Sequence, residues 1–256
     1  MNYRQNVRNF WEEAYRRYSD GGYLNDDTHL ADMRFALEKR ELERIIEKNS
    51  SPGSRRRALD VGCGNGRFTR VLATHFEEAV GIDISKTIIE KNLSQDFPPN
   101  CRFRHEDLIE SAESENGRYD FVYVGGVLMY VDDAQIGEYL QRLRHILREG
   151  GVLVLRESVM SRAAEYSGDA EYPVFYRHKA YYREAVSLKY LGSRQNYAYR
   201  VGELRKNLAP LGMASLLKHP KISSAATGLL AFKDIVWKPG RNRLVNYYYI
   251  FRREDG

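Results

Sequence analysis

Cysteine is scarce in this sequence, since Cys63 and Cys101 are the only two among 256 residues. Two cysteines cannot build the disulfide framework of a small secreted domain, so they indicate a reducing compartment. The first residues form no apolar core of the kind found in signal peptides, and no apolar run approaches the length of a membrane span. We therefore expect a cytoplasmic protein without a membrane partner.

Metal-ligand spacing is also lacking, because the six histidines are scattered and neither cysteine has a nearby partner. We expect no metal site. The net charge of +5 is modest, so the positions of the charges matter more than their sum. There are no internal repeats or low-complexity tracts, and the length suits one α/β domain with additions. Tyrosine, by contrast, is abundant with 19 residues.

The stretch 58–83 has the pattern of a nucleotide-binding strand, turn and helix. An apolar run too short for a helix ends at Asp60, and glycines follow at 62, 64 and 66. Glycine suits that turn because a ligand approaches the backbone closely and because side chains would forbid its dihedral angles. Asp83 ends the next strand about 20 residues later, where an acid meets ribose hydroxyls in such units. The alternative is a tight turn without a ligand.

The spacing Gly62-x-Gly64-x-Gly66 after Asp60 resembles motif I of class I S-adenosylmethionine (SAM)-dependent methyltransferases. The resemblance implies SAM as cofactor, with Asp60 near the methionine ammonium and Asp83 at the ribose. An anionic Asp60 suits that ligand and would repel a phosphate. An acid near the end of the third strand would meet the adenine amino group, with Asp107 as first choice and Glu106 as second. The predicted cofactor-binding residues are Asp60, Gly62, Cys63, Gly64, Asp83, Ile84, Glu106, Asp107, Leu108 and Gly125.

Strands and helices continue to alternate after Asp83. The pattern predicts a helix over 84–93, a helix between Asp132-Asp133 and Gly150-Gly151, and a buried strand at 152–155. Later strands are expected at 214–218 and 244–251. Strand ends near 60, 83, 107, 125 and 156 would line one edge, where open α/β sheets bind ligands. Together with the resemblance, this implies an α/β Rossmann-like, seven-stranded class I methyltransferase sheet with helices on both faces.

An aromatic-rich leader precedes this unit. We expect a short helix within residues 6–24 and a hinge at Gly21-Gly22. Asp26-Asp27-Thr28 supplies N-cap candidates for a second helix that runs to about Asn49. The leader could cover the cofactor as a lid, and the alternative is that its tyrosines only pack the helices. The predicted parts of a single domain are a helical lid (1–52), a SAM-binding core (53–160), a substrate-covering insertion (161–200) and a C-terminal helix and strands (201–256).

A narrower resemblance concerns the acceptor. Several clusters resemble the N-terminal catalytic domain of plant-type phosphoethanolamine (phosphobase) N-methyltransferases. They are Phe10–Glu13, Gly66–Thr69, Val127–Val131, Gly150–Gly151, Arg156–Ser158, Tyr176–Arg177 and Tyr182. One departure is Val124-Gly125-Gly126, which replaces a more polar, aromatic turn after the fourth strand.

Charge supports an anionic acceptor. Between Tyr172 and Lys206, eight basic side chains face only Glu184 and Glu203 among acids, and seven tyrosines are interleaved. Arginine and tyrosine hydroxyls suit a phosphate or carboxylate, whereas the alternative is a solvated basic helix face. The predicted substrate-binding residues are Tyr176, Arg177, Tyr181, Tyr182 and Arg183.

These observations predict a SAM-dependent methyltransferase acting on a small, phosphate- or carboxylate-bearing molecule, with phosphoethanolamine-type N-methylation favoured. His178 could take a proton from the amine, Tyr18, Tyr23 and Tyr130 could orient it, and Glu157 could act electrostatically. Alternatives are an α-N-terminal protein methyltransferase, another small-molecule N- or O-methyltransferase, a non-catalytic SAM-binding protein and, ranked lower, an RNA methyltransferase.

Overall fold

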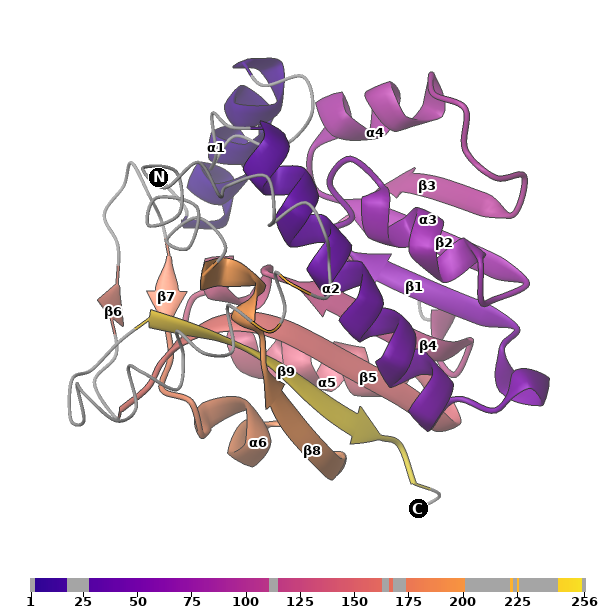
Figure 1. Cartoon of the computed structure of the whole chain (residues 1–256). Coiled ribbons are helices and arrows are strands. Elements are labelled where there is room, and N and C mark those ends of the chain that lie inside the picture. Colours follow the sequence, from indigo (N-terminus) through magenta and orange to yellow (C-terminus); the bar gives the residue numbers. More distant parts are fainter. Residues whose placement is uncertain are drawn as a thin grey trace.

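Figure 1 shows a computed structural model of the chain, in which seven strands form one sheet. The structure describes residues 3–17, 28–110, 115–162, 166–167, 174–200, 222, 225 and 244–254. The strand order is β3-β2-β1-β4-β5-β9-β8, in which β3 through β5 run parallel and β9 is antiparallel to both neighbours. This arrangement confirms the predicted seven-stranded Rossmann-like fold.

The strands of the main sheet are short except for β5 and β9. They are β1 (Arg57–Val61), β2 (Glu78–Asp83), β3 (Cys101–His105), β4 (Tyr119–Gly125), β5 (Leu147–Met160), β8 (Lys189–Gln195) and β9 (Leu244–Arg252). A separate antiparallel pair consists of β6 (Tyr166–Ser167) and β7 (Phe175–Tyr176).

Helices cover both faces of the sheet, and α2 crosses its front face diagonally in Figure 1. The α-helices are α1 (Tyr3–Arg17), α2 (Thr28–Asn49), α3 (Arg67–Ala73), α4 (Lys86–Leu93), α5 (Ile136–Ile146) and α6 (Tyr181–Ala185). Short 3-10 helices are η1 (Pro52–Ser54), η2 (Leu108–Glu110), η4 (Leu128–Tyr130) and η5 (Tyr197–Arg200). No helix in the described ranges is both long enough and apolar enough to cross a membrane.

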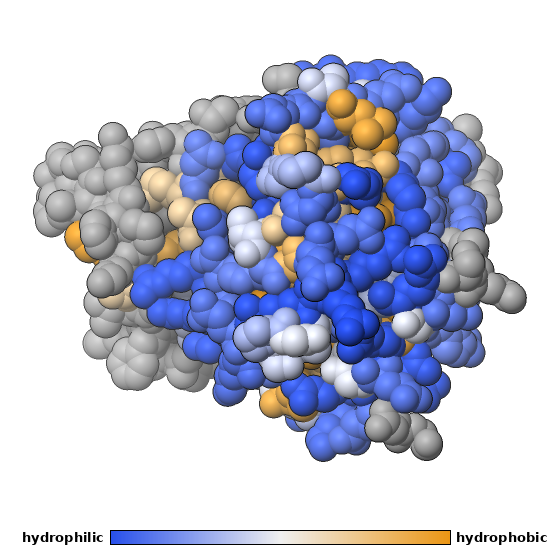
Figure 2. Space-filling model, turned by 90° about the vertical axis from the view of Figure 1, so that its right-hand side faces the viewer, coloured by the Kyte–Doolittle hydropathy of each residue, from blue (hydrophilic) through white to orange (hydrophobic). Residues whose placement is uncertain are grey.

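Two apolar clusters sandwich the sheet, because successive strand residues point to opposite faces. Ala58 packs in the cluster with Leu42 and Ile46 of α2, whereas its neighbour Leu59 packs in the cluster with Leu143 of α5. The outer surface on the right-hand side of Figure 1 is mostly hydrophilic, with small separate hydrophobic groups (Figure 2). Burial on both faces therefore explains the unbroken apolar runs of the parallel strands.

The predicted bounds of α5 are wrong at both ends. The helix begins at Ile136 because a turn at Asp132 precedes it. In this turn the Asp132 carboxylate accepts a hydrogen bond from the Gln135 amide at 2.9 Å, and the Asp132 carbonyl accepts one from the Ile136 amide at 3.0 Å. It ends at Ile146 rather than at the glycine pair. The amides of residues 117 and 118 donate to the carbonyls of residues 145 and 146, and the Arg253 guanidinium donates to the carbonyl of residue 144. The chain then continues directly into β5.

Another difference concerns the predicted insertion, 161–200. Its residues Lys189–Gln195 form β8, the edge strand of the main sheet, through antiparallel pairing with β9. All residues of β8 are exposed except 192 and 195, which are half-buried. An exposed edge strand of this kind has no apolar pattern from which it could be predicted. The last predicted strand, 244–251, is confirmed as β9. The hinge at Gly21-Gly22, the helix near 201–208 and the strand at 214–218 lie outside the described residues.

Candidate functional site

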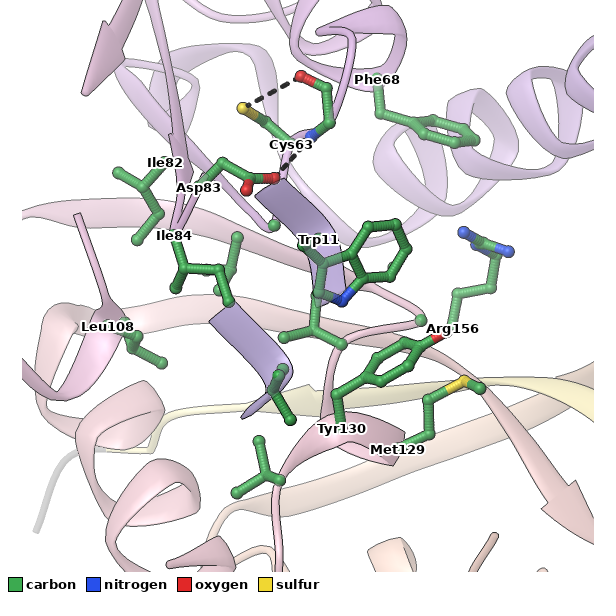
Figure 3. Close-up of a pocket in the computed structure, with 18 of the residues that line it drawn as sticks. Trp11, Cys63, Phe68, Ile82, Asp83, Ile84, Leu108, Met129, Tyr130 and Arg156 are labelled. Atoms are coloured by element: carbon green, nitrogen blue, oxygen red, sulfur yellow. Dashed lines mark hydrogen bonds between the residues drawn. The ribbon is translucent and has the colours of Figure 1, made fainter. Parts of the chain in front are cut away.

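A cavity of about 490 Å³ opens at the carboxyl edge of the parallel strands. Its wall comes from the turn after β1, the ends of β2, β4 and β5, and side chains of α1, α2 and η4 (Figure 3). Many predicted site residues meet here. Those that line the cavity are Gly62, Cys63, Gly64, Asp83, Ile84, Glu106, Leu108, Gly125, Tyr130 and Tyr176.

The glycine turn after β1 leaves backbone open to this cavity. Gly62 and Gly64 have φ angles of 67° and 51°, in the left-handed region that glycine tolerates best. A Cβ on Gly62 would lie 2.3 Å from Val127 Cγ2, and one on Gly64 would lie 3.1 Å from the Tyr15 hydroxyl. Any side chain at Gly62 would therefore force the turn and the loop after β4 apart.

Asp83 joins the end of β2 to this turn. Its carboxylate accepts hydrogen bonds from the Gly64 amide at 3.0 Å and the Ser85 amide at 2.9 Å. Burial raises the pKa of Asp83 to about 6, although these two amides favour the ionised form. A carboxylate held in this way at the cavity wall can accept hydrogen bonds from a ribose.

Asp60 lies deeper than the sequence suggests. It is 2% exposed, accepts a hydrogen bond from Thr69 Oγ1 at 2.7 Å, and is not among the described residues that line the cavity. Burial raises the pKa of Asp60 to about 7. Its observed contact is thus with the start of α3, beneath the glycine turn, so direct contact with the methionine ammonium has no geometric support.

The two acids after β3 have exchanged their expected places. Glu106 lines the cavity and pairs with Arg104 at 3.0 Å. Asp107 is 3% exposed and turns away, accepting hydrogen bonds from Arg4 Nε at 2.9 Å and the Tyr139 hydroxyl at 2.5 Å. Glu106 is therefore the acid of this pair that faces the cavity, whereas Asp107 anchors the start of α1.

Helix α1 covers the cavity with aromatic side chains. Trp11 stacks on Tyr15 with ring centroids 5.4 Å apart and meets the Tyr130 ring edge-to-face at 5.1 Å. All three line the cavity, and Trp11 and Tyr130 lie close together in Figure 3. The predicted Tyr18 and Tyr23 lie outside the described residues. The aromatic spacing of the leader was the sequence signal for this cover, but it did not single out Trp11 and Tyr15.

Two buried charges hold the short helix η4. The Glu157 carboxylate is fully buried and accepts hydrogen bonds from the Val127 and Leu128 amides at 3.1 Å each. Arg177, 2% exposed, donates to the Leu128 and Val131 carbonyls at 3.0 and 2.8 Å. Glu157 and Arg177 thus fix both ends of the loop that brings Tyr130 to the cavity.

This geometry corrects the predicted anion contact of Arg177, because its guanidinium is committed to η4 and to Asp133 at 2.7 Å. The neighbouring predicted residues also miss the described cavity wall. Tyr182 is a residue of α6 whose side chain is fully buried in the core, whereas Arg183 pairs with Glu184 on the surface. The remaining predicted residues outside that wall are His178, Tyr181 and Glu157.

The cavity wall also contains residues that the sequence did not assign to the site. They are Arg34, Phe68, Met129, Arg156, Ser158 and Leu244. The position of Arg156 at the end of β5 was a signal in the sequence, because strand ends meet at the ligand-binding edge. Arg34 had no such signal, since it lies on a helix.

The residues fit an adenosyl cofactor. The side-chain-free turn at Gly62 and Gly64 offers close approach to backbone, and Asp83 offers a buried acceptor 3.0 Å from the same turn. Burial raises the pKa of Cys63 well above its ordinary value, so its thiol contributes an apolar wall rather than a charge.

Several known proteins are similar to this chain. A family model described as a methyltransferase domain matches residues 29–200. Phosphoethanolamine N-methyltransferase 1 of Zea mays is 29% identical over 185 residues, which are 70% of this chain and 35% of that protein. N-terminal Xaa-Pro-Lys N-methyltransferase 1 of Mus musculus is 23% identical over 141 residues, or 54% and 63% of the two chains.

The fold has a solved counterpart in phosphoethanolamine N-methyltransferase 1 of Haemonchus contortus, in complex with phosphoethanolamine and S-adenosylhomocysteine. The two structures superpose with a TM-score of 0.65 at 17% identity, covering 100% of this chain and 50% of that one. The chain spans about a third of the length of the plant relatives it matches. With its sheet order, glycine turn and family match together, the chain belongs to the SAM-dependent methyltransferase-domain family.

Proposed function

We propose that this domain transfers the methyl group of SAM to a small acceptor that carries an anionic group, with phosphoethanolamine-type N-methylation as the favoured reaction. The charge distribution of the cavity carries this proposal. Asp83 and Glu106 are the acids in its described wall, and Arg34 and Arg156 are the bases. The similar plant proteins are phosphoethanolamine N-methyltransferases, which supports the same acceptor class.

SAM supplies an already activated methyl group on a sulfonium, so the domain must align the acceptor, exclude water and manage a proton. Trp11 and Tyr130 meet edge-to-face across the cavity and cover it with aromatic surface. Aromatic faces stabilise a developing ammonium and displace water. We therefore assign Tyr130 to orienting the amine, with Trp11 beside it.

An amine acceptor must attack in its neutral form, so a proton has to leave. His178 lies outside the described cavity wall, and its ring packs against that of Tyr181 with centroids 6.2 Å apart. This position does not support His178 as the base. Tyr130 and Tyr176, in contrast, line the cavity, and each carries a hydroxyl group. Glu157 acts on this site through the η4 amides that it holds, not by direct contact.

A second candidate is methylation of a protein α-amino group, because the Mus musculus enzyme is similar over 54% of the chain. A positively charged peptide requires an acidic groove. Arg34 and Arg156 in the wall of the cavity oppose such a substrate, so we rank it second.

The test is methyl transfer from labelled SAM to phosphoethanolamine and to ethanolamine in parallel, with a basic peptide as third acceptor. Preferential methylation of phosphoethanolamine is the expected result. Asp83→Asn serves as the control for dependence on the cofactor site. Methylation of the peptide alone, or of ethanolamine equally well, would overturn the anionic-acceptor proposal while leaving methyl transfer intact.

A further inference from the structure

The wall of the cavity contains two arginines from different elements. Arg156 ends β5, and Arg34 lies on α2. In Figure 3, Arg156 lies on the far side of Trp11 and Tyr130 from Asp83. In the sheet order, β2 and β5 are separated by β1 and β4. Three strand spacings place the ends of β2 and β5 about 14 Å apart.

The Arg156 guanidinium is held in one orientation. Its Nε donates to the Tyr123 hydroxyl at 2.8 Å, and its Nη1 donates to Glu38 Oε1 at 3.2 Å. The Phe68 ring lies 5.6 Å from the guanidinium carbon. The side chain is 11% exposed, so little rotamer freedom remains to be lost when a ligand binds.

The glycine pair after β4 makes room for this arginine. A Cβ on Gly125 would lie 3.1 Å from Arg156 Nη2 and 3.0 Å from the Tyr123 hydroxyl. Gly126 has a φ of 75°, and its nearest neighbour for a Cβ is again Arg156 Nη2, at 3.9 Å. The Gly125-Gly126 turn is therefore linked in space to the position of Arg156.

Glu38, the acid that holds Arg156, lies one helical turn after Arg34 on α2, so the two arginines are connected through this residue. Glu38 is 4% exposed, accepts from Asn196 Nδ2 at 2.8 Å as well as from Arg156, and is not among the described lining residues. One buried acid thus faces Arg156, and Arg34 adds a second cation to the wall. An anion with two or more oxygens suits such a pair, because guanidinium groups bind phosphate and carboxylate through several directed hydrogen bonds.

We propose that Arg156 and Arg34 form the subsite for the acceptor's phosphate or carboxylate, over the Gly125-Gly126 turn. This inference rests on the proposed function for the identity of the ligand as acceptor. It replaces Arg177 as the anion-binding residue. The methionine carboxylate of the cofactor has the same chemistry, so the test must distinguish these two sources.

The test measures binding, not turnover. Inorganic phosphate and phosphoethanolamine are titrated calorimetrically into protein saturated with S-adenosylhomocysteine, and S-adenosylhomocysteine is titrated separately. The variants are Arg34→Gln, which removes the charge on α2, and Arg156→Lys, which keeps a positive charge for Glu38. Arg44→Gln is the matched control, because Arg44 lies on α2 outside the described cavity wall and pairs with Glu41.

We expect both variants to lose about tenfold or more in phosphoethanolamine affinity and to keep their S-adenosylhomocysteine affinity, with Arg44→Gln unchanged. Unchanged phosphoethanolamine affinity in both variants would overturn the subsite. Loss of S-adenosylhomocysteine affinity instead would assign the arginines to the cofactor carboxylate and also overturn it. Arginine-dependent binding without methylation would support the subsite and refute phosphoethanolamine as the acceptor.

Discussion

Glu12 of α1 caps the N-terminus of α4, where its carboxylate accepts hydrogen bonds from the Lys86 amide at 2.7 Å and the Ser85 hydroxyl at 3.1 Å. Burial opposes its ionisation, but hydrogen bonds from Thr87, Lys86 and Ser85 lower the pKa of Glu12 overall. Nearby, Lys91 Nζ donates to the Tyr15 carbonyl. Helix α1, which covers the cavity, is thus attached to α4, the helix that follows Asp83.

Glu12→Gln should loosen this cover. Loss of the charge at a helix N-terminus costs roughly 1 to 2 kcal/mol. We expect faster amide hydrogen exchange in α1 and weaker S-adenosylhomocysteine binding. Glu13→Gln is the matched control, since Glu13 pairs only with Arg17 among the described contacts and is 51% exposed. Equal exchange rates in the two variants would show that Glu12 does not fasten α1.

Gly62→Ala should abolish tight cofactor binding. Its Cβ would meet Val127 Cγ2 at 2.3 Å, and its φ of 67° is strained for alanine. We expect a loss of about 1 to 3 kcal/mol in the free energy of unfolding and a larger loss of S-adenosylhomocysteine affinity. Gly53→Ala is the control, because nothing lies within 4 Å of a Cβ there. A calorimetric titration that gave the same affinity for both variants would contradict the close approach of ligand to this turn.

Cofactor affinity should fall as the pH drops through about 6. Below that value Asp83, whose pKa burial raises to about 6, becomes neutral and is a weaker acceptor for ribose hydroxyls. The folded pKa exceeds the unfolded value of about 3.9, so this group stabilises the cofactor-free protein in acid. That contribution disappears as the pH rises through about 6. Binding and stability should therefore respond to pH in opposite directions.

Calorimetric titration of S-adenosylhomocysteine between about pH 5 and pH 7.5 checks this expectation. Asp83→Asn should bind weakly throughout and lack this pH dependence, which separates Asp83 from Asp60 and Glu157, whose pKa values burial also raises. An affinity of the unmodified protein that stays constant over this range would exclude ionised Asp83 as the ribose acceptor.

The cofactor end of the site could be predicted because its signals are local in sequence. Gly62 and Gly64 are two residues apart, and Asp83 ends the next strand of the same unit, so one βαβ pattern brings them together. The fold class followed from the same alternation of strands and helices. Asp107 was expected ahead of Glu106 from the family resemblance, but Glu106 is the one in the cavity wall. Adjacent residues at a strand end point to opposite sides, and the sequence does not say which side faces the cavity.

The acceptor end could not be predicted from composition. Arg177 belongs to a basic stretch, but its burial depends on Leu128 and Val131, which are more than forty residues away in sequence. Arg34 and Arg156 come together only through packing of α2 against the sheet. Charge counts along the chain cannot distinguish an arginine that holds backbone carbonyls from one that faces a cavity.

Arg177→Ala should damage stability more than anion recognition. It would leave the Leu128 and Val131 carbonyls without their donor in a buried setting, at a cost of roughly 2 to 5 kcal/mol in the free energy of unfolding. Arg183→Ala is the control from the same segment, because its partner Glu184 is 60% exposed and surface ion pairs contribute little. Urea denaturation measures the difference. If Arg177→Ala unfolded like Arg183→Ala yet lost phosphoethanolamine affinity alone, Arg177 would bind the anion after all, and the role of Arg156 would have to be abandoned.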